Sequence, residues 1–107
     1  MAWTVETLND VVDAELEALP ADMRARFSHI SWLIEELGLE RVRAPHVKHL
    51  RGPLWEMRMK GRDGIARALY VTAIGRRVVV LRVFIKKTQK TPSREIALAL
   101  QRAKEVS

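Results

Sequence analysis

Apolar and polar residues alternate along the middle of the chain, and this alternation predicts a β-sheet. Residues 55–60, WEMRMK, place an apolar residue at every second position, which is the period of a strand with one buried face. A turn over 61–64 leads to a second strand over 65–73. The next run, 77–86, contains VVVLRVFI and is apolar at nearly every position. We expect this run to be the central strand, covered on both faces.

The N-terminal part of the chain shows the three- and four-residue spacing of two amphipathic helices. Thr7, with Asp10 three residues later, fits a capping box that starts the first helix, and Pro20 ends it. The second helix, 21–37, keeps one face apolar, and Gly38 fits the position just beyond its end. We expect the two helices to form a hairpin that lies on the sheet.

The remaining segments complete the fold prediction. Residues 2–6 alternate and fit a first strand, whereas 40–52 reads as a polar connector. Near the C-terminus, Thr91 fits the N-cap and Pro92 the first position of a last helix. The sequence therefore predicts a single α+β domain over residues 1–107. Its sheet is twisted and mainly antiparallel with about four strands, and it carries an N-terminal helical hairpin and a C-terminal helix.

Charge divides the chain into an acidic and a basic part. Residues 41–94 contain fifteen Lys or Arg against two acidic residues, a net charge of +13, whereas residues 1–40 contain two Arg against nine acids, a net charge of −7. The whole chain carries +6. A basic region of this kind favours an anionic partner such as nucleic acid. The alternative is that these charges only form a solvated surface.

Composition also excludes several classes of protein. The chain has no cysteine, which excludes disulfides, thiol catalysis and the usual Cys-containing zinc sites, and which makes a reducing cytosol the expected compartment. No basic segment followed by an apolar run begins the chain, and no window approaches about eighteen apolar residues. We therefore expect a cytoplasmic protein with no membrane partner.

Three segments of the chain form a recognisable set: LWEMR at 54–58, GIARALY at 64–70 and FIKKTQKTP at 84–92. Together they resemble the RelE/ParE superfamily of bacterial toxins, most closely its HigB-like, phage-derived branch. The resemblance implies a small RelE-like fold and a toxin of a type II toxin–antitoxin system that is neutralised by a cognate helix-turn-helix antitoxin. It also implies a ribosome-dependent mRNA endonuclease, with the ribosome and mRNA as partners. DNA would be contacted only indirectly, through the antitoxin complex.

The sequence offers no evident metal or cofactor site. It lacks a Walker loop, a GxGxxG and an HExxH spacing, and its basic region contains only the carboxylates of Glu56 and Asp63. We therefore expect no metal and no cofactor. RNA can still be cut, because its 2′-hydroxyl can attack the adjacent phosphate if the protein orients the attack, moves a proton and stabilises the developing charge.

Basic side chains can perform most of this chemistry. Arg offers phosphate a fixed fork of donors, and Lys can lose its proton where neighbouring cations lower its pKa. The resemblance implies an Arg within the R-x-L-Y segment and basic residues at the end of the last strand as the catalytic groups. The expected catalytic residues are Arg67, Lys86, Lys87 and Lys90. The further residues expected to bind RNA are Arg58, Lys60, Tyr70, Arg82, Phe84 and Arg94.

Each of these interpretations has an alternative. The cations are also compatible with an ordinary solvated surface, and Arg67 with a simple ion pair to Glu56 across the sheet. Tyr70 and Phe84 are compatible either with stacking on bases or with the core. For the whole protein, the alternative is a non-enzymatic module that inhibits DNA gyrase as ParE does, or one that only binds nucleic acid. The lysine-rich KKTQK segment favours the RNA-cleaving branch.

Overall fold

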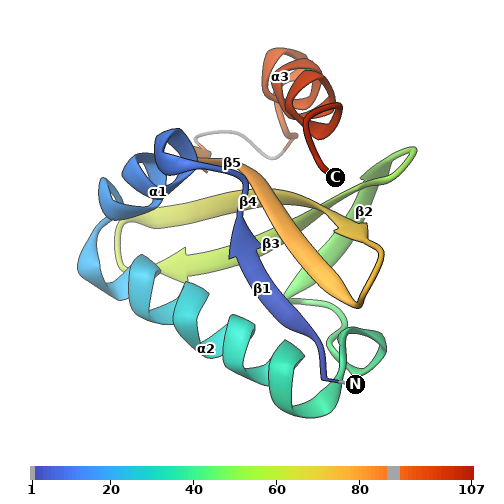
Figure 1. The fold of residues 1–107 in the computed structure, drawn as a ribbon. Coiled ribbons are helices and arrows are strands. Elements are labelled where there is room, and N and C mark those ends of the chain that lie inside the picture. The colour runs from blue at the N-terminus through green and yellow to red at the C-terminus, as the bar shows by residue number, and fades with distance from the viewer. Residues whose placement is uncertain (1, 87–89) are drawn as a thin grey trace.

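A five-stranded sheet forms the centre of the fold, and helices cover both of its faces (Figure 1). The structure is a computed structural model that describes residues 2–86 and 90–107. In chain order the elements are β1 (Thr4–Thr7), α1 (Asp10–Glu17), α2 (Ala21–Leu37), the 3₁₀-helix η1 (Leu39–Arg41), β2 (Val47–Arg51), β3 (Leu54–Gly61), β4 (Gly64–Ala73), β5 (Arg77–Lys86) and α3 (Ser93–Ala103).

The strands lie in the order β1-β5-β4-β3-β2. β1 pairs with β5 in parallel, and all other neighbours are antiparallel. The apolar run predicted as the central strand forms β5, which lies between β1 and β4 and is buried along most of its length. The middle of the five strands is β4, because β2 adds a strand at the far edge.

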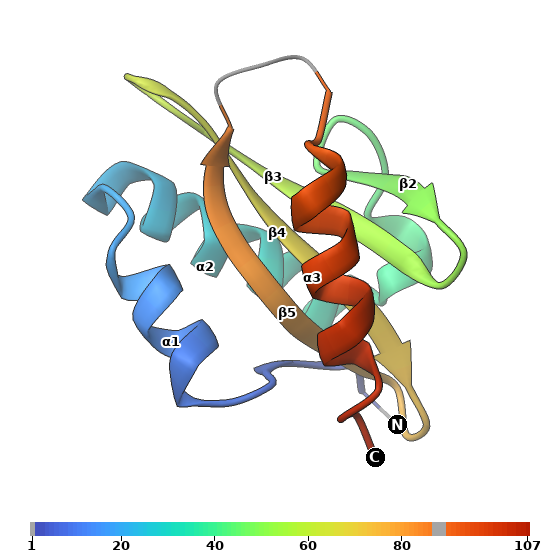
Figure 2. The same ribbon diagram turned by 90° about the horizontal axis from the view of Figure 1, so that it is seen from above.

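Strands β3, β4 and β5 contribute buried residues to two cores, since neighbouring residues of a strand point to opposite faces of the sheet. Helices α1 and α2 lie on one face and α3 lies on the other, as Figure 2 shows. The first core packs Met23 and Ile30 of α2 with Met57 and Met59 of β3. The second core packs Ile96 of α3 against the opposite face of the sheet. None of the described helices is both long and apolar enough to cross a lipid bilayer.

The predicted fold class is confirmed. The protein is α+β, its sheet is mainly antiparallel, and it has an N-terminal pair of helices and a C-terminal helix. Helix α2 has the predicted bounds, and Gly38 follows it with a φ of 93°. The sheet has five strands instead of about four, because residues 47–51 of the expected connector form the edge strand β2. The sequence of this strand, VKHLR, shows little alternation of apolar and polar residues, and Val47 is its only buried residue.

Two predicted helix caps are wrong. Asn9, and not Thr7, caps α1, because the Asn9 side chain accepts hydrogen bonds from two N–H groups of the first turn. At the start of α3, Pro92 occupies the cap position and makes no side-chain cap. The hydroxyl of Thr91 donates instead to a carboxylate oxygen of Glu56, at 2.7 Å. The hydroxyl of Thr91 therefore hydrogen-bonds to the buried carboxylate of Glu56 and not to the N–H groups at the start of α3.

Candidate functional site

A pocket of about 210 Å³ lies on the α3 face of the sheet, between β2, the end of β5 and the start of α3. Its lining residues are Lys48, Leu50, Arg51, Glu56, Lys86, Lys90, Thr91, Ser93 and Ile96. Four of these side chains are cations and one is a carboxylate, so we call it the basic pocket. Two of the expected catalytic residues, Lys86 and Lys90, thus line one cavity.

The geometry of the strands explains how the basic pocket is assembled. Lys48 of β2 and Glu56 of β3 are direct partners across the sheet, so their side chains lie on the same face. Lys86 is the last residue of β5, and Lys90 is exposed shortly before α3. The expected catalytic residue Lys87 lies outside the described residues.

Glu56 is a buried carboxylate surrounded by cations, and only 1% of the residue is exposed. Its Oε1 accepts a hydrogen bond from Nη1 of Arg67 at 2.8 Å, and its Oε2 accepts one from Oγ1 of Thr91 at 2.7 Å. Nε of Arg58 lies 3.8 Å from Oε1. These partners offset the large free-energy cost of removing a charged carboxylate from water.

Arg67 lies on β4, and only 2% of the residue is exposed. It forms an ion pair with Glu56, which is the alternative that the sequence offered for this residue. Burial lowers the pKa of its guanidinium below the ordinary value, although Glu56 opposes this effect. Arg67 is not among the lining residues of the basic pocket. Arginine stays protonated even when its pKa falls moderately, so Arg67 places a fixed positive charge near the pocket.

Lys86 is a largely buried lysine, and only 8% of it is exposed. Burial lowers the pKa of its ammonium group, and the charge of Arg67 lowers it further. Glu56 acts in the opposite direction, whereas Arg58 and Lys48 add to the lowering. A lysine with a lowered pKa exchanges its proton closer to neutral pH, which suits it to proton transfer.

Arg58 and Lys60 line a neighbouring pocket of about 260 Å³ on β3. The other residues of this pocket are Arg26, Pro45, His46 and Ile65. Three of its six residues are Lys or Arg, so basic side chains continue from the basic pocket along β3. The side chain of Arg58 is 33% exposed, so it can contact both Glu56 and a ligand.

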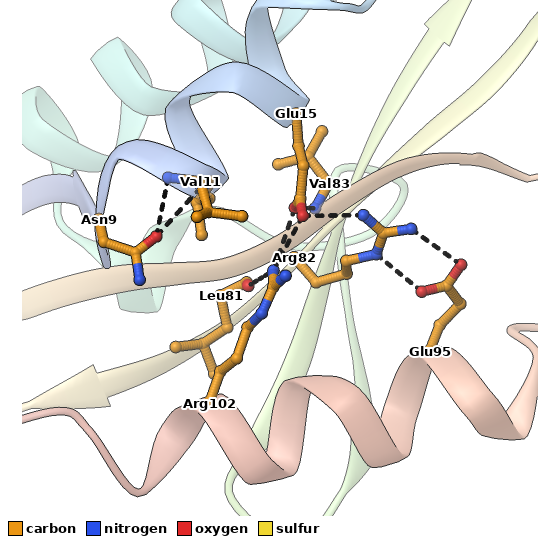
Figure 3. A network of polar contacts seen from close by, with 9 residues as sticks. Asn9, Val11, Glu15, Leu81, Arg82, Val83, Glu95 and Arg102 are labelled. Atoms are coloured by element: carbon orange, nitrogen blue, oxygen red, sulfur yellow. Dashed lines mark hydrogen bonds and ion pairs between the residues drawn. The ribbon is translucent and has the colours of Figure 1, made fainter.

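Arg82 lies in a network of ion pairs that joins α1, β5 and α3 (Figure 3). Its Nε and Nη2 donate to Glu95 at 2.7 and 3.3 Å, and its Nη1 lies 2.9 Å from Glu15. Arg102 also pairs with Glu15, at 3.0 Å, and donates to the carbonyl oxygen of Leu81. The hydrogen bond with Glu95 raises the pKa of Arg82 above its ordinary value, although burial opposes it. Two carboxylates therefore neutralise this cation.

The remaining residues expected to bind RNA occupy three different positions. Phe84 packs partly buried against the second core, with the guanidinium carbon of Arg82 at 5.7 Å from its ring centroid. Arg94 is exposed on the first turn of α3. Tyr70 lies in the first core with 1% exposed, where burial raises its pKa. It lines a groove of about 750 Å³ that also includes Trp55 and lies away from the basic pocket.

Sequence reasoning missed two contributions to the basic pocket. Lys48 and Arg51 belong to the strand that was expected to be a connector. The available signal was Gly52-Pro53 between two strand-like runs, which is typical of a hairpin turn. Glu56 was considered only as a partner of Arg67, because its contact with the segment before α3 depends on tertiary structure. Among the described residues, no three His, Cys, Asp or Glu side chains group as a metal site would require.

A sequence model of one protein family, described as phage derived protein Gp49-like, matches residues 14–104. The chain belongs to this Gp49-like family. The resemblance to a phage-derived family is therefore confirmed. No curated protein matches the sequence of this Gp49-like chain.

One similar solved structure supports the same fold assignment. It is a chain of the archaeal RelE–RelB complex from Pyrococcus horikoshii OT3, which the Gp49-like protein matches with a TM-score of 0.59 and 21% sequence identity. The match covers 81% of this chain and 98% of that chain. At this level of identity the likeness shows that the Gp49-like protein has a RelE-like fold.

Proposed function

We propose that this Gp49-like protein is the toxin of a type II toxin–antitoxin system and a metal-independent endoribonuclease that cuts mRNA on the ribosome. The observation that carries the proposal is the basic pocket, where Lys48, Arg51, Lys86 and Lys90 converge around one buried carboxylate. The RelE-like fold and the Gp49-like family support it. The similar archaeal chain is part of a complex with RelB, which supports an antitoxin as partner here.

The proposed reaction is an internal transfer of the phosphate within RNA. The 2′-oxygen forms a bond to the adjacent phosphorus, and the bond from phosphorus to the 5′-oxygen breaks. The products are a 2′,3′-cyclic phosphate and a free 5′-hydroxyl. One proton must leave the 2′-hydroxyl, one must reach the 5′-oxygen, and the extra negative charge of the pentacoordinate phosphorane must be stabilised.

Lys86 is the best candidate for proton transfer because burial and Arg67 lower its pKa. Lys90, with Lys48 and Arg51, supplies charge to the phosphate oxygens from the wall of the basic pocket. Arg67 adds a fixed positive charge beneath the pocket. Lys87, which follows Lys86 in the sequence, keeps its proposed catalytic role.

RNA beyond the scissile phosphate would follow the basic side chains of β3. Arg58 and Lys60 line the neighbouring pocket and are proposed to bind flanking phosphates. Arg94, exposed on α3, is proposed to do the same on the other side. Base contacts from Tyr70, Phe84 and Arg82 require rearrangement of the cores or of the ion-pair network described above, so we assign these three residues the smallest contribution to RNA binding.

The site should depend on the ribosome to position its substrate. Its proton-transfer group is a lysine, and no histidine or second carboxylate lines the described part of the basic pocket. Positioning by a bound partner can supply a large share of the lowering of the barrier. We therefore expect free RNA to be cut poorly in the absence of ribosomes. In the cell, the antitoxin would block this activity in the cytoplasm.

Cleavage of mRNA on purified ribosomes, mapped by primer extension, tests the proposal. The parent protein should cut, and Lys86→Ala should reduce the single-turnover rate by about 100-fold, the usual effect of losing a proton-transfer group. Lys86→Arg should restore little, because arginine keeps the charge but does not release a proton at neutral pH. The control is Lys104→Ala, an exposed lysine at the end of α3, which should cut like the parent.

Two outcomes would contradict the proposed function, and a third would contradict the role of Lys86. Intact mRNA after incubation of ribosomes with the parent protein would exclude the ribonuclease activity. Growth arrest in which translation continues while DNA supercoiling stops would favour a gyrase inhibitor instead. If Lys86→Arg cuts as fast as the parent, Lys86 acts only through its charge and proton transfer must be assigned elsewhere.

A further inference from the structure

Glu56 has an unusual place in the basic pocket, because it is the only carboxylate among the described lining residues and it is almost fully buried. A ribonuclease site built from cations gains transition-state stabilisation from positive charge, and a carboxylate subtracts from it. Burying a charged pair in a sheet is also costly, and a pair of well-packed apolar residues is often as stable or more stable. The presence of Glu56 therefore needs an explanation beyond stability.

The two oxygens of Glu56 join parts of the chain that are far apart in sequence. Oε1 accepts from Arg67 on the neighbouring strand β4, and Oε2 accepts from Thr91, 35 residues after Glu56. Thr91 directly follows Lys90, and both line the basic pocket together with Lys86. One carboxylate thus links the sheet to the chain next to the catalytic lysines.

The contact with Thr91 separates this arrangement from a simple ion pair. If Glu56 only neutralised Arg67, one hydrogen-bonded oxygen would satisfy that role. The second oxygen binds a neutral hydroxyl in the segment before α3, at 2.7 Å, and this hydroxyl does not cap the helix. A charge-assisted hydrogen bond of this length is strong and directional, so it fixes the position of the backbone beside Lys90.

We propose that Glu56 is a positioning residue of the ribonuclease site: by holding Arg67 and Thr91, it fixes the basic residues around the scissile phosphate without touching the RNA itself. This inference rests on the proposed ribonuclease function. Glu56 also balances part of the mutual repulsion of the cations, which would otherwise push Lys86 and Arg67 apart. It therefore keeps several positive charges close together before the substrate arrives.

Thr91→Val tests the positioning role with little change in volume, because it removes the hydroxyl and keeps the β-branched shape. We expect its single-turnover rate of mRNA cleavage on ribosomes to fall about tenfold, since small displacements of catalytic groups have effects of this order or larger. Its affinity for ribosomes should stay within about twofold of the parent, because the phosphate-binding charges remain. Thr91→Ser, which restores the hydroxyl, should recover most of the rate.

The matched control is Thr4→Val, which makes the same change at an exposed position of β1 and should cleave like the parent. Urea unfolding of all variants identifies the folded fraction. A Thr91→Val protein that is less stable but cuts at the parental rate when folded would show a purely structural contact and overturn the inference. So would a loss of rate that Thr91→Ser does not recover.

Glu56→Gln provides a readout that does not depend on ribosomes. Glutamine keeps the shape and the ability to hydrogen-bond but removes the negative charge that raises the pKa of Lys86. The positive groups that act on Lys86 from β4, β3 and β2 are Arg67, Arg58 and Lys48, and they stay. The pKa of Lys86, followed by NMR of the free protein, should therefore fall. An unchanged pKa would overturn the role of Glu56 in balancing the cations.

The outcomes separate this inference from the proposed function. A parent protein that leaves mRNA on ribosomes intact overturns the ribonuclease function itself. A parent protein that cuts, beside a Thr91→Val variant that cuts equally fast, overturns only the positioning role of Glu56.

Discussion

Asp22, near the start of α2, shows how a single side chain fixes a turn of the sheet. Its Oδ2 accepts a hydrogen bond at 2.7 Å from the backbone N–H of Arg62, in the turn between β3 and β4. This hydrogen bond lowers the pKa of Asp22 below its ordinary value. A carboxylate that is better stabilised in the folded state than in the unfolded chain makes folding dependent on pH.

We predict the direction of this dependence. Because the folded pKa of Asp22 is lower than the unfolded value of about 3.9, its contribution to stability is present above the unfolded pKa and is lost as the pH falls toward the folded one. Asp22→Asn should therefore be less stable than the parent at pH 7, and the difference should shrink below about pH 4. Urea midpoints at several pH values measure this. Asp63→Asn, in the same turn, is the control, and a difference that is constant with pH would contradict the prediction.

The family resemblance and the clustered lysines of the sequence named two residues that line the candidate site. Lys86 and Lys90 were named from the sequence, and they line the same pocket. Lys48 was not expected in the site and Thr91 was expected only to cap the last helix, because their place beside Glu56 depends on strand register and on a contact over 35 positions. No local pattern encodes such contacts. The sequence did allow the ion pair between Arg67 and Glu56, because opposite charges on adjacent strands commonly meet.

At the scale of elements, prediction succeeded where periodicity and boundary residues agree. Helix α2 has the predicted bounds, because its apolar spacing lies between a proline and a glycine. Strand β2 was missed because its sequence lacks the alternation of apolar and polar residues, and only its first residue is buried. Its extended conformation depends on its pairing with β3. The cap of α1 was wrong because several polar residues near its start are able to cap. The cap of α3 was wrong because the hydroxyl of Thr91 donates to Glu56, and Pro92 at the cap position makes no side-chain cap.

The network of Arg82 predicts how α3 is held on the sheet. Arg82→Met removes a cation that binds Glu95 and Glu15, whose side chains are only 10% and 14% exposed. Glu95 would then remain largely buried without this partner, and we expect a loss of about 1–3 kcal/mol of stability. Urea unfolding gives this value.

A matched variant on the same strand provides the comparison. Arg77, at the start of β5, pairs with Glu6, and their side chains are 32% and 43% exposed. Arg77→Met should cost less than about 1 kcal/mol, because water and salt screen an exposed ion pair. Equal losses for Arg82→Met and Arg77→Met would show that burial does not govern the strength of these ion pairs.

At the scale of the whole molecule, the two parts of the chain place their charges differently. The acidic residues 1–40, with a net charge of −7, form β1, α1 and α2, whereas the basic residues 41–94 form the rest of the sheet and the start of α3. Glu15 of α1 nevertheless reaches Arg82 and Arg102. The acidic part thus neutralises the cations that lie near α1.

This distribution predicts that binding to RNA depends steeply on salt. If the four cations that line the basic pocket each neutralise a phosphate, a plot of log affinity against log salt for single-stranded RNA should have a slope of about −3. Affinity would then fall about fiftyfold between 50 and 200 mM salt. A short RNA with a 2′-deoxy residue at the cleavage position allows binding to be measured without cutting. Lys48→Ala should reduce the slope by about 0.7, whereas Lys104→Ala, outside the pocket, should leave it unchanged. An affinity that does not vary with salt would mean that phosphates are not what the basic pocket binds.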